Sequence, residues 1–168
     1  MKNFSFVILF LICFNLNASE KNIDILKEGK KIIFIRHSIA PGGGDPKNFK
    51  IDDCKTQRNL SEAGIKQSIK IGNFFLENKI PIDKVLSSEW CRCKDTAKYA
   101  FKKYKTFSAL NSFFDQKFKK NKESQIKNLK LFLKKWENEK NLILVTHYVV
   151  IQEMTKESAM SGEMIITD

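Results

Sequence analysis

Two histidines and three arginines are the residues of this chain best suited to chemistry on a phosphate or carboxylate. They are His37, His147, Arg36, Arg58 and Arg92, and every other basic residue is a lysine. A guanidinium is a planar fork that binds an oxyanion through two hydrogen bonds, whereas an ammonium is a mobile point charge. We therefore interpret arginine at these three positions as a requirement for geometry rather than for charge alone.

Both histidines closely follow apolar runs that read as buried strands. Residues 32–35 lead directly into Arg36 and His37, and residues 142–145 end two positions before His147. Open α/β sheets bind their ligands at the carboxyl ends of strands. We therefore expect the two histidines to meet at one edge of a sheet.

Arg92 lies in a segment that predicts a strand end followed by the start of a helix, with Ser87-Ser88 opening the turn. Helix N-termini present free backbone N–H groups and a favourable dipole to an anion, so an arginine there would complete a phosphate pocket. Arg58 immediately precedes another predicted helix start and is a further candidate clamp. A surface arginine explains Arg58 equally well.

Three helices are predicted from apolar residues at helical spacing. Ser61 is a favourable N-cap for the first, which ends before Pro81. Its core face is predicted to comprise Ile65, Ile69, Gly72, Phe75 and Leu76. The second helix runs from about Trp90 to Phe101, and the third carries an apolar stripe at Ile126, Leu129, Phe132, Leu133 and Trp136.

Strands are predicted between these helices, over 32–36, at Val85-Leu86, over 142–146 and, as an edge strand, over 163–167. Alternation of strands and helices indicates a mainly parallel sheet that is covered by helices on both faces. The predicted fold class is therefore α/β, a three-layer α/β/α sandwich.

The first 18 residues predict a secretory signal peptide, with Lys2 before an apolar stretch over 4–14 and Ala18 as the last residue removed. The stretch is short for a membrane span. Lipoprotein-type cleavage at Cys13 and an uncleaved anchor are the alternatives. Residues 19–168, about 150 in number, then form one exported domain that we expect in the periplasm, without membrane insertion after signal removal.

The chain is strongly basic, with a formal net charge of +11. Its lysines are scattered and lack the interleaved aromatic residues that single-strand nucleic-acid binders use. We therefore expect a solvated basic surface that attracts small anionic or phosphoglycan substrates, and no nucleic-acid partner. The oligomeric state does not follow from the sequence.

A polar loop over 41–59 contains the run Gly42-Gly43-Gly44, which lacks the Walker and dinucleotide-binding spacings. We interpret the loop as a mobile rim of the site, with a phosphate cradle as the alternative. In an oxidising compartment Cys54 could pair with Cys91 or with Cys93. Three cysteines without paired spacing do not make the usual zinc set, and no metal site is predicted.

Four short motifs follow one another along the chain, and their sequences are Arg36-His37-Ser38, Asn59-Leu60-Ser61-Glu62-Ala63-Gly64, Ser87-Ser88 through Arg92 to Thr96-Ala97, and Val145-Thr146-His147. They resemble the Arg-His-Gly, Leu-Ser/Thr-x-x-Gly, Ser-x-x-x-Arg-x-x-x-Thr-Ala and Thr/Gly-His motifs of the histidine phosphatase superfamily, whose fold is called phosphoglycerate-mutase-like. The resemblance spans residues 31–147, which is most of the mature chain.

The resemblance implies a role for each matched residue. His37 would attack phosphorus to form a phosphohistidine, which water then hydrolyses. Arg36, Arg92 and His147 would stabilise the charge on the non-bridging oxygens. Arg58 and Ser88 are expected to contact the substrate, and neither a metal nor another cofactor is required.

The sequence departs from the family pattern at three places. Ser38 replaces the usual glycine, and Tyr148 follows His147 where a small residue is common. Larger family members carry an acidic proton donor after the second helix, where Ser112 stands in this chain. Asp115 is the nearest candidate for that role, with Asp45 and Asp53 as alternatives.

These features predict a small phosphatase that acts on a phosphomonoester or a phosphoramidate. Without a strong general acid it would favour leaving groups of low pKa, because proton donation commonly contributes about 10²- to 10⁴-fold to the rate. A binding module of the same fold, which holds phosphate or a phosphoglycan without turnover, is the alternative.

Overall fold

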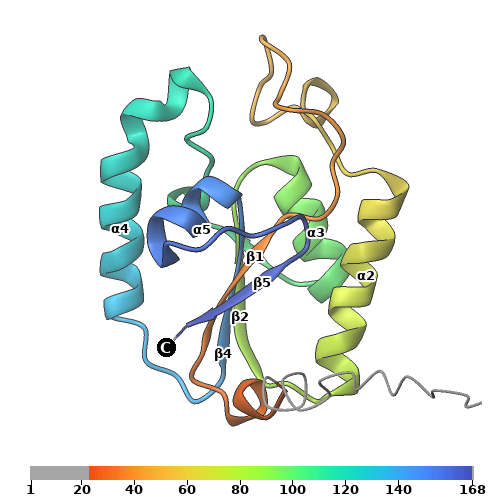
Figure 1. Ribbon diagram of the computed structural model, residues 1–168, viewed down its shortest axis with the longest axis vertical. Helices are drawn as coiled ribbons and strands as arrows, with labels where there is room; N and C mark the ends of the chain where they lie inside the picture. Colours follow the sequence, from red (N-terminus) through yellow and green to blue (C-terminus); the bar gives the residue numbers. More distant parts are fainter. Residues whose placement is uncertain (1–22, 168) are drawn as a thin grey trace, which may run out of the picture.

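A five-stranded sheet runs through the centre of the computed structural model, which describes residues 23–167 (Figure 1). The strand order is β3-β2-β4-β1-β5. The four strands β1 to β4 pair in parallel, and β5 lies antiparallel to β1 at one edge. The strands are β1 (Ile32–Arg36), β2 (Ile82–Ser87), β3 (Lys105–Thr106), β4 (Asn141–Thr146) and β5 (Met164–Thr167).

Helices cover both faces of this sheet, so the predicted three-layer fold is confirmed. One face is covered by α2 (Glu62–Glu77) and α3 (Cys91–Phe101), and the other by α4 (Lys122–Lys134) and α5 (Tyr148–Thr155) (Figure 1). Alternate residues of β1 enter the two cores: Ile33 and Ile35 pack toward α2 and α3, whereas Ile32 and Phe34 pack toward α4 and α5. The strand is apolar on both sides because both sides are buried.

The predicted strands β1, β4 and β5 are confirmed, but β2 is longer than the predicted pair Val85-Leu86. The short strand β3 pairs only with Leu86 and Ser87, so the first half of β2 lies at an open edge and tolerates Asp83 and Lys84. The helix α5 was not predicted. Its first four residues, 148–151, read as apolar and β-rich, because they include three β-branched side chains.

The predicted core face of α2 is correct at Phe75, which is buried, but wrong at two of its five positions. Ile69 and Leu76 are exposed, and the buried residues are Gly64, Ser68, Ile71 and Phe75. A Cβ atom on Gly64 would lie 2.1 Å from the carbonyl oxygen of Ile39, so this side of the helix packs directly against backbone. Small residues allow this close approach. A prediction based on the spacing of large apolar residues does not identify them as part of the buried face.

The predicted signal peptide, residues 1–18, lies outside the described residues. Within residues 23–167 the search for a helix of sufficient length and hydropathy to cross the bilayer finds none.

Candidate active site

A cavity of about 400 Å³ opens where β1 and β4 end and α3 begins. The structure brings together six of the predicted site residues on its wall, which are Arg36, His37, Arg58, Arg92, Asp115 and His147. Its other lining residues include Asp45, Trp90, Ser112, Phe114 and Tyr148. The register of the two strands explains the meeting of the histidines, because Arg36 pairs with Thr146 across the sheet.

His37 is almost fully buried, with 2% of its surface exposed. Its Nδ1 lies 2.8 Å from the carbonyl oxygen of Ser38. A carbonyl can only accept, so Nδ1 carries the proton in the neutral ring and Nε2 keeps a lone pair. Burial, together with the charge of Arg92, lowers the pKa of His37 to about 3. The neutral ring with a free Nε2 is the protonation state of a nucleophile.

His147 caps the start of α5, and its ring lies 5.5 Å from that of His37. Its Nε2 lies 2.9 Å from the hydroxyl oxygen of Ser88. Ser88 donates its hydrogen to Asn111 Oδ1, so its oxygen is left to accept from His147 Nε2–H. Burial and then the charge of Arg92 lower the pKa of His147 well below its ordinary value.

Ser88 is itself fully buried behind His147 and is absent from the cavity wall. The predicted substrate contact of Ser88 is therefore replaced by a hydrogen bond to a histidine that lines the cavity. The Ser-x-x-x-Arg motif identified the segment but could not show which of its side chains points outward.

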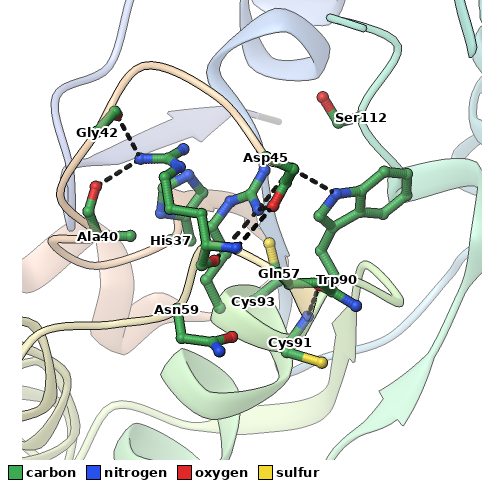
Figure 2. A network of polar contacts seen from close by, with 12 residues as sticks. His37, Ala40, Gly42, Asp45, Gln57, Asn59, Trp90, Cys91, Cys93 and Ser112 are labelled. Atoms are coloured by element: carbon green, nitrogen blue, oxygen red, sulfur yellow. Dashed lines mark hydrogen bonds and ion pairs between the residues drawn. The ribbon is translucent and has the colours of Figure 1, made fainter. Parts of the chain in front are cut away.

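Arg36 and Arg58 are anchored in the same way, through one terminal nitrogen. Arg36 Nη1 donates to the carbonyl oxygen of Ala159 over 2.9 Å, and Arg58 Nη1 donates to the carbonyl oxygens of Ala40 and Gly42. Figure 2 shows Ala40 and Gly42 beside each other with these contacts dashed. Burial lowers the pKa of both guanidinium groups.

Arg92 repeats this pattern with a carboxylate as its anchor. Its Nη1 lies 2.8 Å and 3.0 Å from the two carboxylate oxygens of Asp45, and both side chains are buried. In all three arginines, Arg36, Arg58 and Arg92, the Nε atom is buried without a hydrogen-bond partner among the described residues. Buried guanidinium donors normally find an acceptor. Three unsatisfied Nε donors on residues that line one cavity indicate a site for an oxyanion.

Asp45 makes more contacts in the site than its sequence position indicates, since the sequence suggests it only as an alternative proton donor. It also accepts from Trp90 Nε1 over 3.1 Å and from the backbone N–H of Arg58 over 3.0 Å. Figure 2 shows Asp45 beside Trp90, with their hydrogen bond dashed. The run of glycines before Asp45 was the available signal, since it allows the chain to bend inward there.

The predicted acid candidates differ in position. Asp115 lines the cavity, and its carboxylate also accepts from the backbone N–H of Lys117. Asp53 is not on the cavity wall, because it caps a short 3-10 helix by accepting from the backbone N–H of Lys55. Ser112 occupies the wall where the resemblance led us to expect an acid, and its hydroxyl accepts from the N–H of Phe114.

The loop over 41–59 is fastened to the site. A disulfide joins Cys54 to Cys91, so the first of the two predicted alternatives is the observed pairing. Cys93 is a buried free thiol, and burial raises its pKa to about 12. Gln57 Oε1 accepts from the backbone N–H of Cys91. The predicted rim is thus a wall of the cavity that is tied to α3. The part of the chain that the structure describes contains no cluster of three potential metal ligands.

No protein-family model and no curated protein matches the sequence. Among solved structures, the protein histidine phosphatase SixA complexed with tungstate is similar over 82% of this chain and 94% of its own, with 16% identity and a TM-score of 0.55. The phosphoglycerate mutase of Thermus thermophilus is similar over 82% and 92%, with 14% identity and a TM-score of 0.56.

A mutant phosphoserine phosphatase from Entamoeba histolytica, in complex with phosphoserine, is similar over 81% of this chain and 89% of its own, with 18% identity and a TM-score of 0.53. Identities this low support an agreement of fold, and the observed sheet with its two covering layers agrees with it. The chain therefore has the phosphoglycerate-mutase-like fold.

Proposed function

We propose that this protein is a phosphatase that forms a phosphohistidine at His37. The observation that carries the proposal is the set of three arginines on one cavity, each with a buried and unpartnered Nε, around a neutral histidine whose Nε2 is free. Phosphatases among the proteins of similar fold support the same activity in general.

The reaction follows from the protonation states in the site. The lone pair of His37 Nε2 attacks phosphorus, and the bond from phosphorus to the leaving group breaks with its electron pair on the leaving atom. Arg36, Arg58 and Arg92 hold the non-bridging oxygens and stabilise their charge in the in-line transition state. Water then attacks the phosphohistidine, loses a proton to solvent, and returns His37 to its neutral form. These steps require no metal, because the guanidinium groups supply the positive charge.

The residues on the leaving-group side of the cavity favour substrates whose leaving group departs with little protonation. Asp115 is the proposed proton donor, although its carboxylate already accepts a backbone N–H. Phe114, of which 56% is exposed, and Tyr148 form an aromatic wall with ring centroids 5.9 Å apart. A flat leaving group of low pKa, such as a phenol or an imidazole, would pack there. Aryl phosphates and phosphoramidates are therefore the proposed substrate class.

The cellular setting of this activity is proposed from the sequence. The signal-like residues 1–18 favour export to the periplasm, and the basic surface would attract an envelope phosphoglycan as readily as a small phosphorylated molecule. The alternative is a binding module that holds such a phosphate without turnover. It is favoured by Ser112, which lines the cavity where the resemblance leads us to expect an acidic proton donor.

The test is mass spectrometry of the intact protein, quenched without acid during turnover of an aryl phosphate. Wild type is expected to carry one transient phosphoryl group, mapped to His37, which is absent from His37→Ala. Tungstate binding, followed by the thermal unfolding midpoint, serves as the control for an intact pocket. A wild type that binds tungstate but shows neither adduct nor turnover would establish the binding module instead.

A further inference from the structure

The contacts of Asp45 assign it a task that the proposed chemistry does not use. Its carboxylate takes hydrogen bonds from three donor groups on two segments of the chain. These are the Arg92 side chain and the Trp90 indole at the start of α3, and the backbone N–H of Arg58. Only 8% of the side chain is exposed. A carboxylate this buried is stabilised by its donors, and in return it fixes their positions.

The way in which Asp45 holds Arg92 leaves the useful edge of the guanidinium free. Both carboxylate oxygens accept from Nη1, and Nε has no partner among the described residues. Nε and Nη2 form the side-on pair of donors that binds two oxygens of one phosphoryl group. Asp45 therefore anchors Arg92 by one end and does not cover the edge that an oxyanion would take.

The same carboxylate also fixes Arg58. Asp45 Oδ1 accepts from the Arg58 backbone N–H, and the Arg58 guanidinium is anchored in turn by Ala40 and Gly42 on the chain just before Asp45. One acidic side chain thus positions two of the three arginines on the cavity wall. Its charge also offsets part of the positive charge of the three guanidinium groups on the cavity wall.

The geometry argues against proton donation by this residue. Each oxygen of Asp45 already accepts from two N–H donors, one oxygen from Arg92 and Arg58 and the other from Arg92 and Trp90. A carboxylic acid oxygen that carries a proton would have to give up these contacts.

We propose that Asp45 is a positioning residue that orients Arg92 and Arg58 for the phosphoryl group, and that it is neither the proton donor nor a competitor for the phosphate site. This inference rests on the proposed function for its kinetic consequences. Its consequence for oxyanion binding does not depend on turnover.

The test compares Asp45→Asn with Asp53→Asn, a control on the same loop that removes the charge of a residue outside the cavity wall. Tungstate affinity is measured by calorimetry, and kcat/KM is measured with aryl phosphates of low and high leaving-group pKa. Asp45→Asn is expected to lose about 100-fold in both quantities, the cost of a small misplacement of catalytic groups. Asp53→Asn is expected to stay within about 2-fold, as surface changes usually do.

Two further readouts separate positioning from the rival roles. The loss in kcat/KM should be equal for both leaving groups. It should be much smaller when Asp45→Asn is added to Arg92→Ala, because Asp45 then has only Arg58 left to orient. A loss that grows with leaving-group pKa would make Asp45 the acid and overturn the inference. Tighter tungstate binding by Asp45→Asn would make it a competitor and overturn it as well.

The outcomes also keep the two proposals apart. Wild type that binds tungstate without turnover would refute the phosphatase, while a weaker affinity of Asp45→Asn would still support the positioning role. Turnover by wild type with equal affinities in the two asparagine variants would refute the positioning role alone. Wild type that binds no oxyanion would overturn both. Circular dichroism of each variant guards against loss of the fold.

Discussion

Acidification from pH 7 to pH 5 is expected to destabilise the folded protein through its two buried histidines. Burial and the neighbouring arginines lower the pKa of His37 to about 3 and lower that of His147 as well. In the unfolded chain an ordinary histidine titrates near pH 6.5. Between pH 6.5 and 3, His37 therefore binds a proton in the unfolded state but not in the folded state. The free energy of unfolding falls as the pH falls over this range.

The magnitude follows from linkage. The contribution of His37 is fully present above pH 6.5 and decreases by about 1.4 kcal/mol per pH unit below it, which gives about 2 kcal/mol between pH 7 and pH 5. His147 adds a loss of the same sign, since its pKa is lowered by the same two causes. No loss of nucleophile is expected over this interval, because His37 stays neutral in the folded state.

The assay is urea unfolding followed by circular dichroism at several pH values between 7 and 5, in buffers free of phosphate. Wild type is compared with His37→Asn, which can still donate to the Ser38 carbonyl but does not titrate. The fall in unfolding free energy should be about 2 kcal/mol smaller in the variant. Groups whose pKa does not depend on His37 cancel in this difference. Equal slopes would mean that the pKa of His37 is not lowered in the folded protein.

Two further predictions concern the elements that shape the site. Replacing Cys54 and Cys91 with serine should lower the unfolding free energy by about 4 kcal/mol, because the bridge closes a separation of 37 residues; an unchanged urea midpoint would show that the loop is held without it. Gly64→Ala should cost about 1–3 kcal/mol by overpacking, because its Cβ would meet the Ile39 carbonyl at 2.1 Å. Gly43→Ala, with nothing within 4 Å, is the matched control, and equal thermal midpoints would contradict the close packing.

The parts of the structure that were predicted correctly have strong local signals. The strands β1 and β4 are uninterrupted apolar runs because both of their faces are buried, and such runs are visible without knowledge of the fold. Ser61 accepts from the N–H of Gly64, as its N-cap signal predicted. Once two parallel strands are adjacent, the residues that follow them must meet, so the juxtaposition of His37 and His147 needed no further information.

The details of the site depend on contacts that leave no trace in residue type. Arg36 is anchored by the carbonyl of Ala159, 123 positions away, and Arg58 by the carbonyl of Gly42. Every residue offers a backbone carbonyl, so nothing in the sequence marks these two as acceptors. The direction in which each guanidinium points is decided by such anchors.

Asp45 is the exception among these anchors, because it does have a residue type that could be noticed. A carboxylate beside two arginines would first be interpreted as a competitor for the phosphate or as an acid. Only the contact through Arg92 Nη1 distinguishes an anchor from either. A carboxylate that anchors an arginine and one that competes with the phosphate are the same residue type, but they have opposite effects on the affinity for an oxyanion. For that reason the tungstate affinity of Asp45→Asn, rather than any further property of the sequence, separates them.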